Sequence, residues 1–333
     1  MTKDLKPDKP FKDIYEQIEI LKNRGLVISD TNKAKEILFT LSYYDLTNGY
    51  KEVFMNDDVF EKGTTIEYIY QFSRFDRSIQ NVLFEYSVIV ETSFKTALAY
   101  TISKNYGVIE NKYLDSKNFL RSNHSKTRQL LDSIKKIYQK PSRYVQEPTR
   151  HYKDTKNHIP PWILFKNITF DQAIKLYKIL KSSDKLEVCN ILMDIDTSDS
   201  NKKEILFTSI NIIRRFRNRI AHNLKFITSV DSTYSINKGL VSKDSYLYLF
   251  ENHSYNNVYS MIICLNILLK DNLMKEELNQ TIINAPRIVS GLNNNLVKEY
   301  YLITGIPIDF RNRVFKLNKA LKKTIPITIN SQG

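Results

Sequence analysis

The sequence contains little glycine and little proline. Only 8 of its 333 residues are glycine and 9 are proline, well below the usual shares of about 7% and about 5%. This scarcity is expected when long helices replace turns. Hydrophobic residues make up 42% of the chain, which is ample for a core. We therefore expect an all-α fold.

Cysteine and long apolar runs are also scarce. The two cysteines, Cys189 and Cys264, lie among apolar neighbours and form no metal or redox spacing, which predicts buried thiols in a reducing compartment. No apolar run approaches the roughly 20 residues that span a bilayer, and the first ten residues contain no apolar signal core. We expect a cytoplasmic protein without a membrane partner.

Acidic residues are outnumbered by basic ones. The chain has 50 Lys and Arg against 36 Asp and Glu, a net charge of +14, which suits a polyanionic partner but does not choose among RNA, DNA and a membrane surface. Basic residues cluster in two segments: residues 116–156 hold eleven Lys or Arg and three acids, and residues 311–323 hold six and no acid.

Apolar residues recur at helical spacing along most of the chain. We expect helices over residues 11–26, 33–44, 66–105, 171–180, 186–193, 205–226, 258–269, 286–302 and 309–323. Two segments break the helical period. Residues 107–160 are less regular, and residues 226–250 flank Asn237-Lys238-Gly239 as a small β-hairpin would.

The helix expected at residues 205–226 combines an apolar stripe with a dense basic face. The stripe consists of Leu206, Ile210, Ile213, Phe216 and Ile220. Opposite it stand Arg214, Arg215, Arg217 and Arg219, followed by His222. Guanidinium groups suit phosphate oxygens, and an imidazole can take or give a proton near neutral pH. The pattern indicates a phosphodiester site, although a solvated basic helix that ends in a histidine would give the same pattern.

Other chemical groups form no convincing site. His124, His151 and His158 lack partners at metal-ligand spacing, and Asp194, Asp196 and Asp199 read as helix caps. Asp76 and Glu91 lie fifteen residues apart and are expected to form ion pairs with neighbouring basic residues. We expect no metal and no cofactor.

Several segments together resemble the Abi family of bacterial abortive-infection proteins, in particular the AbiD/AbiF-like group. In chain order they are Lys9-Pro10-Phe11, Glu16-Gln17-Ile18, residues 21–26 (LKNRGL), Leu41-Ser42-Tyr43-Tyr44, Asn48-Gly49-Tyr50, residues 60–65 (FEKGTT), Phe75-Asp76-Arg77, Glu91 with Lys95-Thr96, Tyr106-Gly107, Pro161-Trp162-Ile163-Leu164, and Arg217-Asn218 with Ala221-His222-Asn223.

The resemblance implies a HEPN-type helical bundle in residues 1–225, with a basic insertion near residues 116–156. Residues 226–333 would form a C-terminal extension of a hairpin followed by helices. Proteins of the HEPN superfamily place an Arg, four to six residues and a His at a dimer interface, and many are metal-independent ribonucleases. Their motif matches Arg217, Asn218 and His222.

Helical geometry favours a site shared by two subunits. Arg217 and His222 point about 140° apart on one straight helix, whereas two copies meeting across a two-fold axis can focus both on one phosphate. The pattern Arg-Asn-Arg recurs at residues 311–313 without a following His, so each chain has one candidate site. We expect a homodimer.

The expected reaction is RNA cleavage by the substrate's own 2′-hydroxyl. His222 would transfer a proton, Arg217 would neutralise the developing charge, and Asn218 would orient one of them. Phosphate contacts are expected from Arg214, Arg215, Arg219 and Lys225.

Two other functions remain open from the sequence. The protein could be a catalytically inactive RNA-binding protein, or an interaction protein that senses a phage component. The family's biology also implies a role in arresting infected cells, and some relatives are restrained by a small noncoding RNA in toxin–antitoxin fashion. Such an RNA would be expected on residues 116–156 and 311–323.

Overall fold

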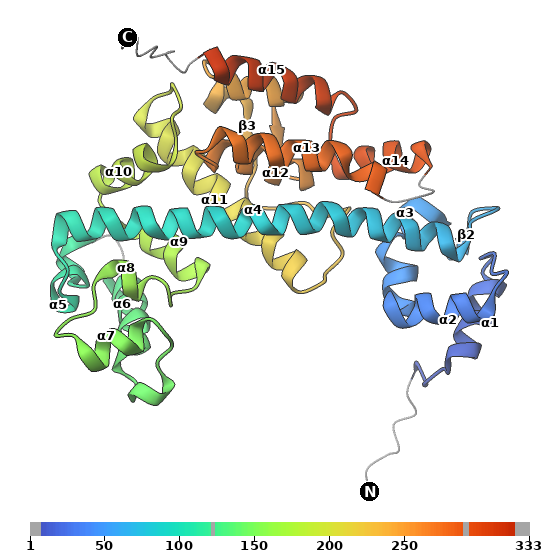
Figure 1. The fold of residues 1–333 in the computed structure, drawn as a ribbon, viewed down its shortest axis with the longest axis horizontal. Helices are drawn as coiled ribbons and strands as arrows, with labels where there is room; N and C mark the ends of the chain where they lie inside the picture. Colours follow the sequence, from blue (N-terminus) through green and yellow to red (C-terminus); the bar gives the residue numbers. More distant parts are fainter. Residues whose placement is uncertain (1–7, 121–123, 289–292, 324–333) are drawn as a thin grey trace, which may run out of the picture.

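A single long helix organises the molecule. The computed structural model describes residues 8–120, 124–288 and 293–323. Helix α4 (Ile66–Tyr106) has 41 residues without a break, a length of about 60 Å. The hydroxyl of Thr65 caps it by accepting a hydrogen bond from the backbone N–H of Tyr68 (3.1 Å). Figure 1 shows α4 crossing the whole molecule, with the other elements above and below it.

The N-terminal lobe (residues 8–60) lies at one end of α4, with its first two helices below that end. Its elements are α1 (Ile14–Asn23), α2 (Thr31–Thr40), the π-helical turn η1 (Asp45–Gly49), α3 (Lys51–Phe54), β1 (Met55–Asn56) and β2 (Val59–Phe60). The two strands pair in an antiparallel hairpin. Gly25 follows α1 with a φ of +87°, as expected for a residue that ends a helix.

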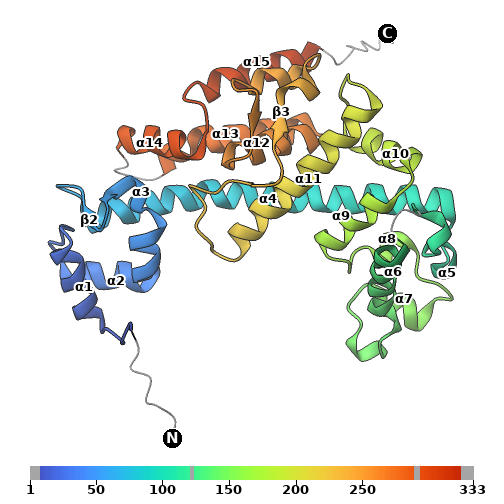
Figure 2. The same ribbon diagram turned by 180° about the vertical axis from the view of Figure 1, so that it is seen from behind.

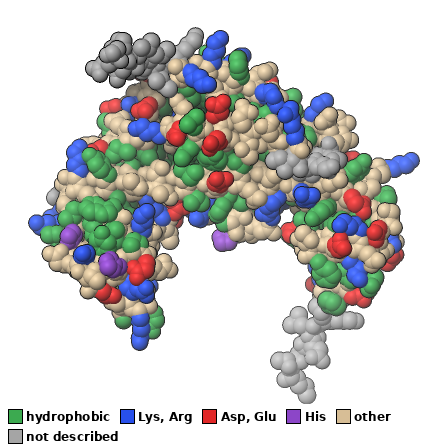
Figure 3. Space-filling view, viewed as in Figure 1, with side chains coloured by type: hydrophobic (Ala, Val, Ile, Leu, Met, Phe, Trp, Pro, Cys, Tyr) green, Lys and Arg blue, Asp and Glu red, His purple; other side chains and the backbone are tan. Residues whose placement is uncertain are grey.

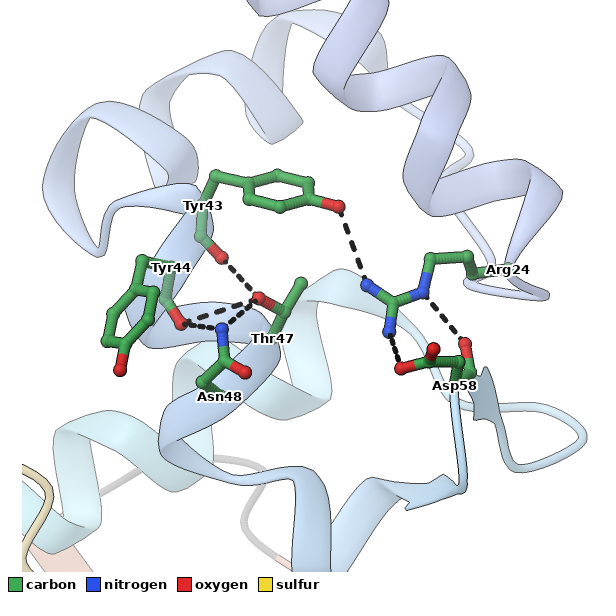
Figure 4. Close-up of polar contacts among 6 residues, drawn as sticks. All are labelled: Arg24, Tyr43, Tyr44, Thr47, Asn48 and Asp58. Carbon is green, nitrogen blue, oxygen red and sulfur yellow. Dashed lines mark hydrogen bonds and ion pairs between the residues drawn. The ribbon is translucent and has the colours of Figure 1, made fainter. Parts of the chain in front are cut away.

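An arginine ties this lobe together (Figure 4). Arg24 donates from Nε to the carbonyl oxygen of Asp58 (2.7 Å), pairs through Nη2 with the Asp58 carboxylate (2.9 Å), and donates from Nη1 to the hydroxyl of Tyr43 (3.4 Å). The hydroxyl of Thr47 donates to the carbonyl oxygen of Tyr43 (2.9 Å). These contacts give part of the resembling segments a structural role.

The insertion lobe (residues 107–168) lies below the other end of α4. Its main elements are α5 (Glu110–Tyr113), α6 (His124–Gln139), α7 (Thr149–Thr155) and α8 (Pro161–Leu164). This lobe is more helical than the sequence predicts, because α6 carries a continuous apolar face that includes Leu131 and Ile134, both buried. Helices α9 (Phe170–Ile179) and α10 (Ser182–Leu192) then lead to α11 (Asp199–Ala221), which crosses α4 (Figure 2).

The C-terminal elements cover the upper side of α4. They are β3 (Ile236–Asn237), the 3₁₀ turns η5 (Lys238–Val241) and η6 (Ser245–Leu249), β4 (Ser254–Tyr255), α12 (Val258–Leu268), α13 (Asn272–Ile288), α14 (Asn294–Thr304) and α15 (Phe310–Lys323). Every residue of α12 is buried, and this helix packs against both α4 and α11. The extension therefore supplies part of the main core.

The molecule is an arch. Both lobes project to the same side of α4, and the C-terminal end of α11 lies between them (Figures 1 and 2). The space-filling view shows a hollowed lower face between the lobes, with Lys and Arg side chains along its edge (Figure 3). The fold thus places the end of α11 in a concave, partly basic surface.

The all-α fold with a small hairpin is confirmed, although its details differ from the predictions. Strand β3 pairs with β4 across residues 238–253, so Asn237-Lys238-Gly239 is not the hairpin turn. The Asn237 side chain instead accepts a hydrogen bond from the N–H of Gly239 (2.7 Å) and starts η5. The helix predicted at residues 286–302 is confirmed in part: its second half corresponds to α14, which begins at Asn294, whereas residues 286–288 belong to α13, which begins at Asn272 and was not predicted. Residues 289–292 lie outside the described chain.

The predicted burial of the two thiols is confirmed. Cys189 and Cys264 are both buried, and burial raises their pKa to about 11 and about 12. Within the ranges that the structure describes, no helix has both the length and the apolarity to cross a membrane.

Candidate active site

Helix α11 buries its apolar stripe as predicted. The hydroxyl of Ser198 caps its start by accepting a hydrogen bond from the N–H of Asn201 (3.2 Å). The predicted stripe lies in the core: Leu206, Ile210, Ile213, Phe216 and Ile220. The opposite face, with its basic residues, is thereby held at the surface.

The helix ends immediately before His222. The N–H of His222 still donates to the carbonyl oxygen of Asn218 (3.0 Å). Asn223 then adopts the left-handed conformation with a φ of +51°, which turns the chain away from the helix axis. The His222 side chain is exposed, so its imidazole is open to a ligand.

Arg217 faces α4. Its Nη2 lies 3.3 Å from Oε2 of Glu91, and its guanidinium lies 5.7 Å from the centre of the Phe84 ring. Glu91 also pairs with Lys95 (2.7 Å), which confirms the predicted ion pairing of this carboxylate. The Arg217 side chain keeps 30% of its surface exposed and therefore remains reachable from solvent.

Arg217 and His222 line different hollows of one subunit. A hollow of about 380 Å³ is lined by His222, Asn218 and Arg219. A second hollow, of about 190 Å³, is lined by Arg217 and Glu91. Asn218 links them, because its Oδ1 accepts a hydrogen bond from Nη1 of Arg217 (3.1 Å). Within one chain, Asn218 shares a hollow with His222 and a hydrogen bond with Arg217. Arg217 and His222 themselves do not line the same hollow.

Two of the predicted phosphate-binding arginines are paired with acids. Arg214 lies 3.4 Å from the carboxylate of Asp171. Arg215 lies 2.6 Å from Asp231, whose side chain is almost fully buried. A neutralised arginine attracts a phosphate less strongly than a free one. The main role of these two ion pairs is therefore to hold α11 against its neighbours, and their arginines are weaker candidates for phosphate binding.

The other two predicted phosphate contacts differ from each other. Lys225 pairs with Glu52 of the N-terminal lobe (2.6 Å), so it ties the loop after α11 to that lobe. Arg219 donates to the carbonyl oxygen of Lys225 (3.4 Å) and has no acidic partner in the part of the chain that the structure describes. Arg219 is consequently the cation in the His222 hollow with the most available charge.

Arg77 of α4 was missed as a site residue. Its Nη2 donates to Oδ1 of Asn223, directly after His222, and its Nη1 donates to Oε1 of Gln80 (3.2 Å). The sequence does mark both residues of this contact, because Arg77 and Asn223 lie in segments that carry the family resemblance. Nothing in the sequence indicated that two residues so far apart touch. Arg77 therefore helps to fix the turn that holds the imidazole.

Asp76, next to Arg77, is a buried carboxylate. It accepts hydrogen bonds from the hydroxyls of Tyr50 (3.1 Å) and Tyr300 (2.9 Å) and from the Gln80 amide (2.7 Å). Burial raises its pKa to about 6. The prediction that Asp76 forms an ion pair is wrong: within the described ranges its partners are neutral hydrogen-bond donors from the N-terminal lobe, α4 and α14.

Metal-binding side chains do not gather anywhere in residues 8–120, 124–288 and 293–323. No group of three or more His, Cys, Asp or Glu side chains there could hold an ion.

Family comparison places the site in context. The family model described as Abi-like protein matches residues 36–228, more than half of the chain. This range includes α4, α11, Arg77, Glu91 and the predicted catalytic residues. No curated protein and no solved structure matches the chain. The chain belongs to the Abi-like protein family.

Proposed function

We propose that this protein is an abortive-infection endoribonuclease that cleaves RNA without a metal ion, in a HEPN-type homodimer that serves anti-phage defence. Membership in the Abi-like family supports the role in abortive infection. The observation that carries the enzymatic part is the exposed imidazole of His222, which lies with Asn218 and Arg219 around one hollow at the end of α11.

The reaction is an internal displacement at phosphorus. The 2′-oxygen of the substrate forms a bond to phosphorus while the bond to the 5′-oxygen breaks. His222 takes the proton from the 2′-hydroxyl or gives one to the leaving 5′-oxygen. Arg217 stabilises the extra negative charge on the phosphoryl oxygens. The products are a 2′,3′-cyclic phosphate and a 5′-hydroxyl, and DNA is not cleaved because it lacks the nucleophile.

A dimer solves the separation of Arg217 from His222. A second copy of α11, related by a two-fold axis, can present its Arg217 to the His222 of the first copy. The exposed part of the Arg217 side chain and the solvent-facing position of His222 are the features that support this arrangement. The hydrogen bond from Arg217 to Asn218 then gives Asn218 a role in orienting the two groups.

The test is cleavage of total RNA in the presence of EDTA. Wild-type protein is expected to produce fragments with 2′,3′-cyclic phosphate ends, and His222→Ala is expected to lose cleavage while it still binds RNA. His253→Ala is the matched control, because His253 is exposed and lies outside the matched family region. It should cleave as the wild type does. Cleavage that survives in His222→Ala, or that EDTA abolishes, would contradict the proposal.

One observation favours a second function. Glu91 and Phe84 hold Arg217 on the α4 side of α11, an arrangement that suits an inactive RNA-binding protein as well. That function predicts steep salt dependence of RNA binding with no cleavage by wild-type protein. Light scattering or analytical ultracentrifugation, run beside the cleavage assay, reports whether the wild-type protein is dimeric.

A further inference from the structure

Lysines from three helices meet at one hollow, away from the end of α11. The hollow lies among α9, α10 and α11 and has a volume of about 460 Å³. Lys178, Lys185 and Lys203 line it, one from each helix. Glu204 is the acidic residue among the described residues that line it. Three positive charges therefore share a small volume with one negative charge.

These lysines are not neutralised within the described parts of the chain. Lys203 donates to the neutral hydroxyl of Ser182 (2.9 Å). The side chains of Lys178 and Lys185 make no hydrogen bond or ion pair with the residues that the structure describes. Burial lowers the pKa of Lys185, and the nearby charges of Lys203 and Lys178 lower it further. Like charges that converge in this way destabilise the fold, and an anionic ligand would relieve the repulsion.

The basic surface continues into a neighbouring hollow. That hollow has a volume of about 820 Å³ and shares Leu120 and Lys178 with the first. It is also lined by Lys126 of α6 and by Lys175, which pairs with Asp171 (2.7 Å). Lysines from both hollows are thus joined through Lys178, and we call the five of them the lysine strip: Lys126, Lys175, Lys178, Lys185 and Lys203. Lysine acts as a point charge for phosphate, so a strip of lysines fits a row of phosphates better than one small anion.

We propose that this lysine strip, centred on Lys178, Lys185 and Lys203, is a second binding site for the RNA backbone. The proposal rests on the ribonuclease function above and extends it, because it places part of the substrate outside the His222 hollow. The contacts are to phosphates, so binding at the strip is independent of base sequence.

The distance along α11 sets the length of RNA that can reach both places. Lys203 and His222 are 19 residues apart on or next to this helix, which corresponds to about 28 Å. At the spacing of about 3.4 Å per nucleotide along a stacked strand, roughly eight nucleotides span that distance. RNA shorter than this can occupy the His222 hollow but not the strip at the same time.

The first experiment measures binding rather than cleavage. The triple variant Lys178→Gln, Lys185→Gln, Lys203→Gln is made in the His222→Ala background and titrated with single-stranded RNA at several salt concentrations. Each phosphate contact contributes about 0.7 to the slope of log K against log salt, so losing three should reduce that slope by about 2. Wild-type protein titrated with single-stranded DNA should give the same slope as His222→Ala protein titrated with single-stranded RNA, because DNA carries the same phosphates.

A matched variant controls for the loss of three charges. Lys51, Lys62 and Lys298 are exposed and have no hydrogen bond or ion pair from their side chains to the described chain; their triple Gln variant should leave the slope nearly unchanged. Equal slopes in both triple variants would overturn the proposal. Stabilisation of the wild type, but not of the lysine-strip variant, by inorganic phosphate without any effect on RNA binding would also overturn it, because that result indicates a small-anion site.

The second experiment separates this proposal from the ribonuclease function. Cleavage is measured with the lysine-strip variant in which His222 is intact. For RNA of about 24 nucleotides, three times the eight-nucleotide span, this variant should have a higher KM than the wild type. Its cleavage of tetranucleotides should equal that of the wild type. If wild-type protein cleaves nothing but the slope difference persists, the ribonuclease function fails and the binding site stands. If cleavage depends on His222 and KM is unchanged for long RNA, the strip is wrong and the ribonuclease function stands.

Discussion

Replacing Asp76 with asparagine should change the way stability depends on pH. The folded-state pKa of this carboxyl is about 6 against an ordinary value of 3.8, because burial disfavours its charged form. Between these values the folded protein holds a proton that the unfolded chain has released. The stability contribution of Asp76 is therefore highest below about pH 4 and falls as pH rises through 6. At 1.36 kcal/mol per pKa unit, the loss is about 3 kcal/mol.

The assay compares thermal unfolding of wild type and Asp76→Asn from pH 4 to pH 7.5. The variant keeps one carbonyl oxygen but replaces the other acceptor by an amide, so it should lose about 1 kcal/mol of hydrogen bonding to Tyr50 or Tyr300. We expect the variant to be less stable than wild type at pH 4 and to gain on it by about 2.5 kcal/mol by pH 7.5, because the remaining part of the loss falls below pH 4. For a chain of 333 residues this corresponds to a relative rise in Tm of about 4 °C.

The comparison is made as a difference so that other titrating groups cancel. Glu61→Gln is the control, because Glu61 is exposed and its variant should differ from wild type by a constant amount at every pH. A constant difference for Asp76→Asn over the same range would refute the reasoning, since it would mean that Asp76 ionises in the folded protein as an ordinary carboxyl does.

Two further substitutions test other contacts. Arg77→Met removes the guanidinium that holds the turn after α11; we expect RNA cleavage about tenfold slower with a Tm change below about 2 °C, whereas Arg74→Met, an exposed arginine on the same helix, should leave both unchanged. Equal cleavage rates in the two variants would show that Arg77 does not position the turn. Gly305→Ala should destabilise by at least about 2 kcal/mol in urea unfolding, because the residue has a φ of +75° and an added Cβ would lie 1.9 Å from Nδ2 of Asn257. Gly63→Ala has a similar φ and open space around it, so it should cost about 1 kcal/mol, and an equal loss in both variants would rule out the steric clash.

The long helices could be predicted because their apolar residues follow one period without competition. Ile66 to Tyr106 is predicted almost to the residue, and the stripe of α11 is buried as expected. Helix α13 was missed because its first half is polar and Pro286 lies near its end, which resembles a helix start. The hairpin turn was misplaced because the side chain of Asn237 caps a 3₁₀ turn, a local choice that alternation of apolar residues does not reveal.

The candidate site was predictable only where it lies within one segment. The exposure of His222 at the end of α11 follows from the period of that helix. The partners of Arg217 and of the turn after His222 come from α4, more than a hundred residues earlier. Charge and spacing indicate which residues need an ion-pair or hydrogen-bond partner. They do not indicate which of the many acids or amides lies next to them in the fold. The lysine strip was invisible for the same reason, since its members come from three helices.

The burial of α12 bears on how this protein can be dissected. Every side chain of that helix lies in the interior beside α4 and α11, although α12 follows the end of the matched family region at residue 228. A fragment cut at that boundary would leave the apolar flanks of α4 and α11 in water. The recognisable part of the sequence is thus not a self-sufficient folding unit, and truncation experiments should retain the chain through α15.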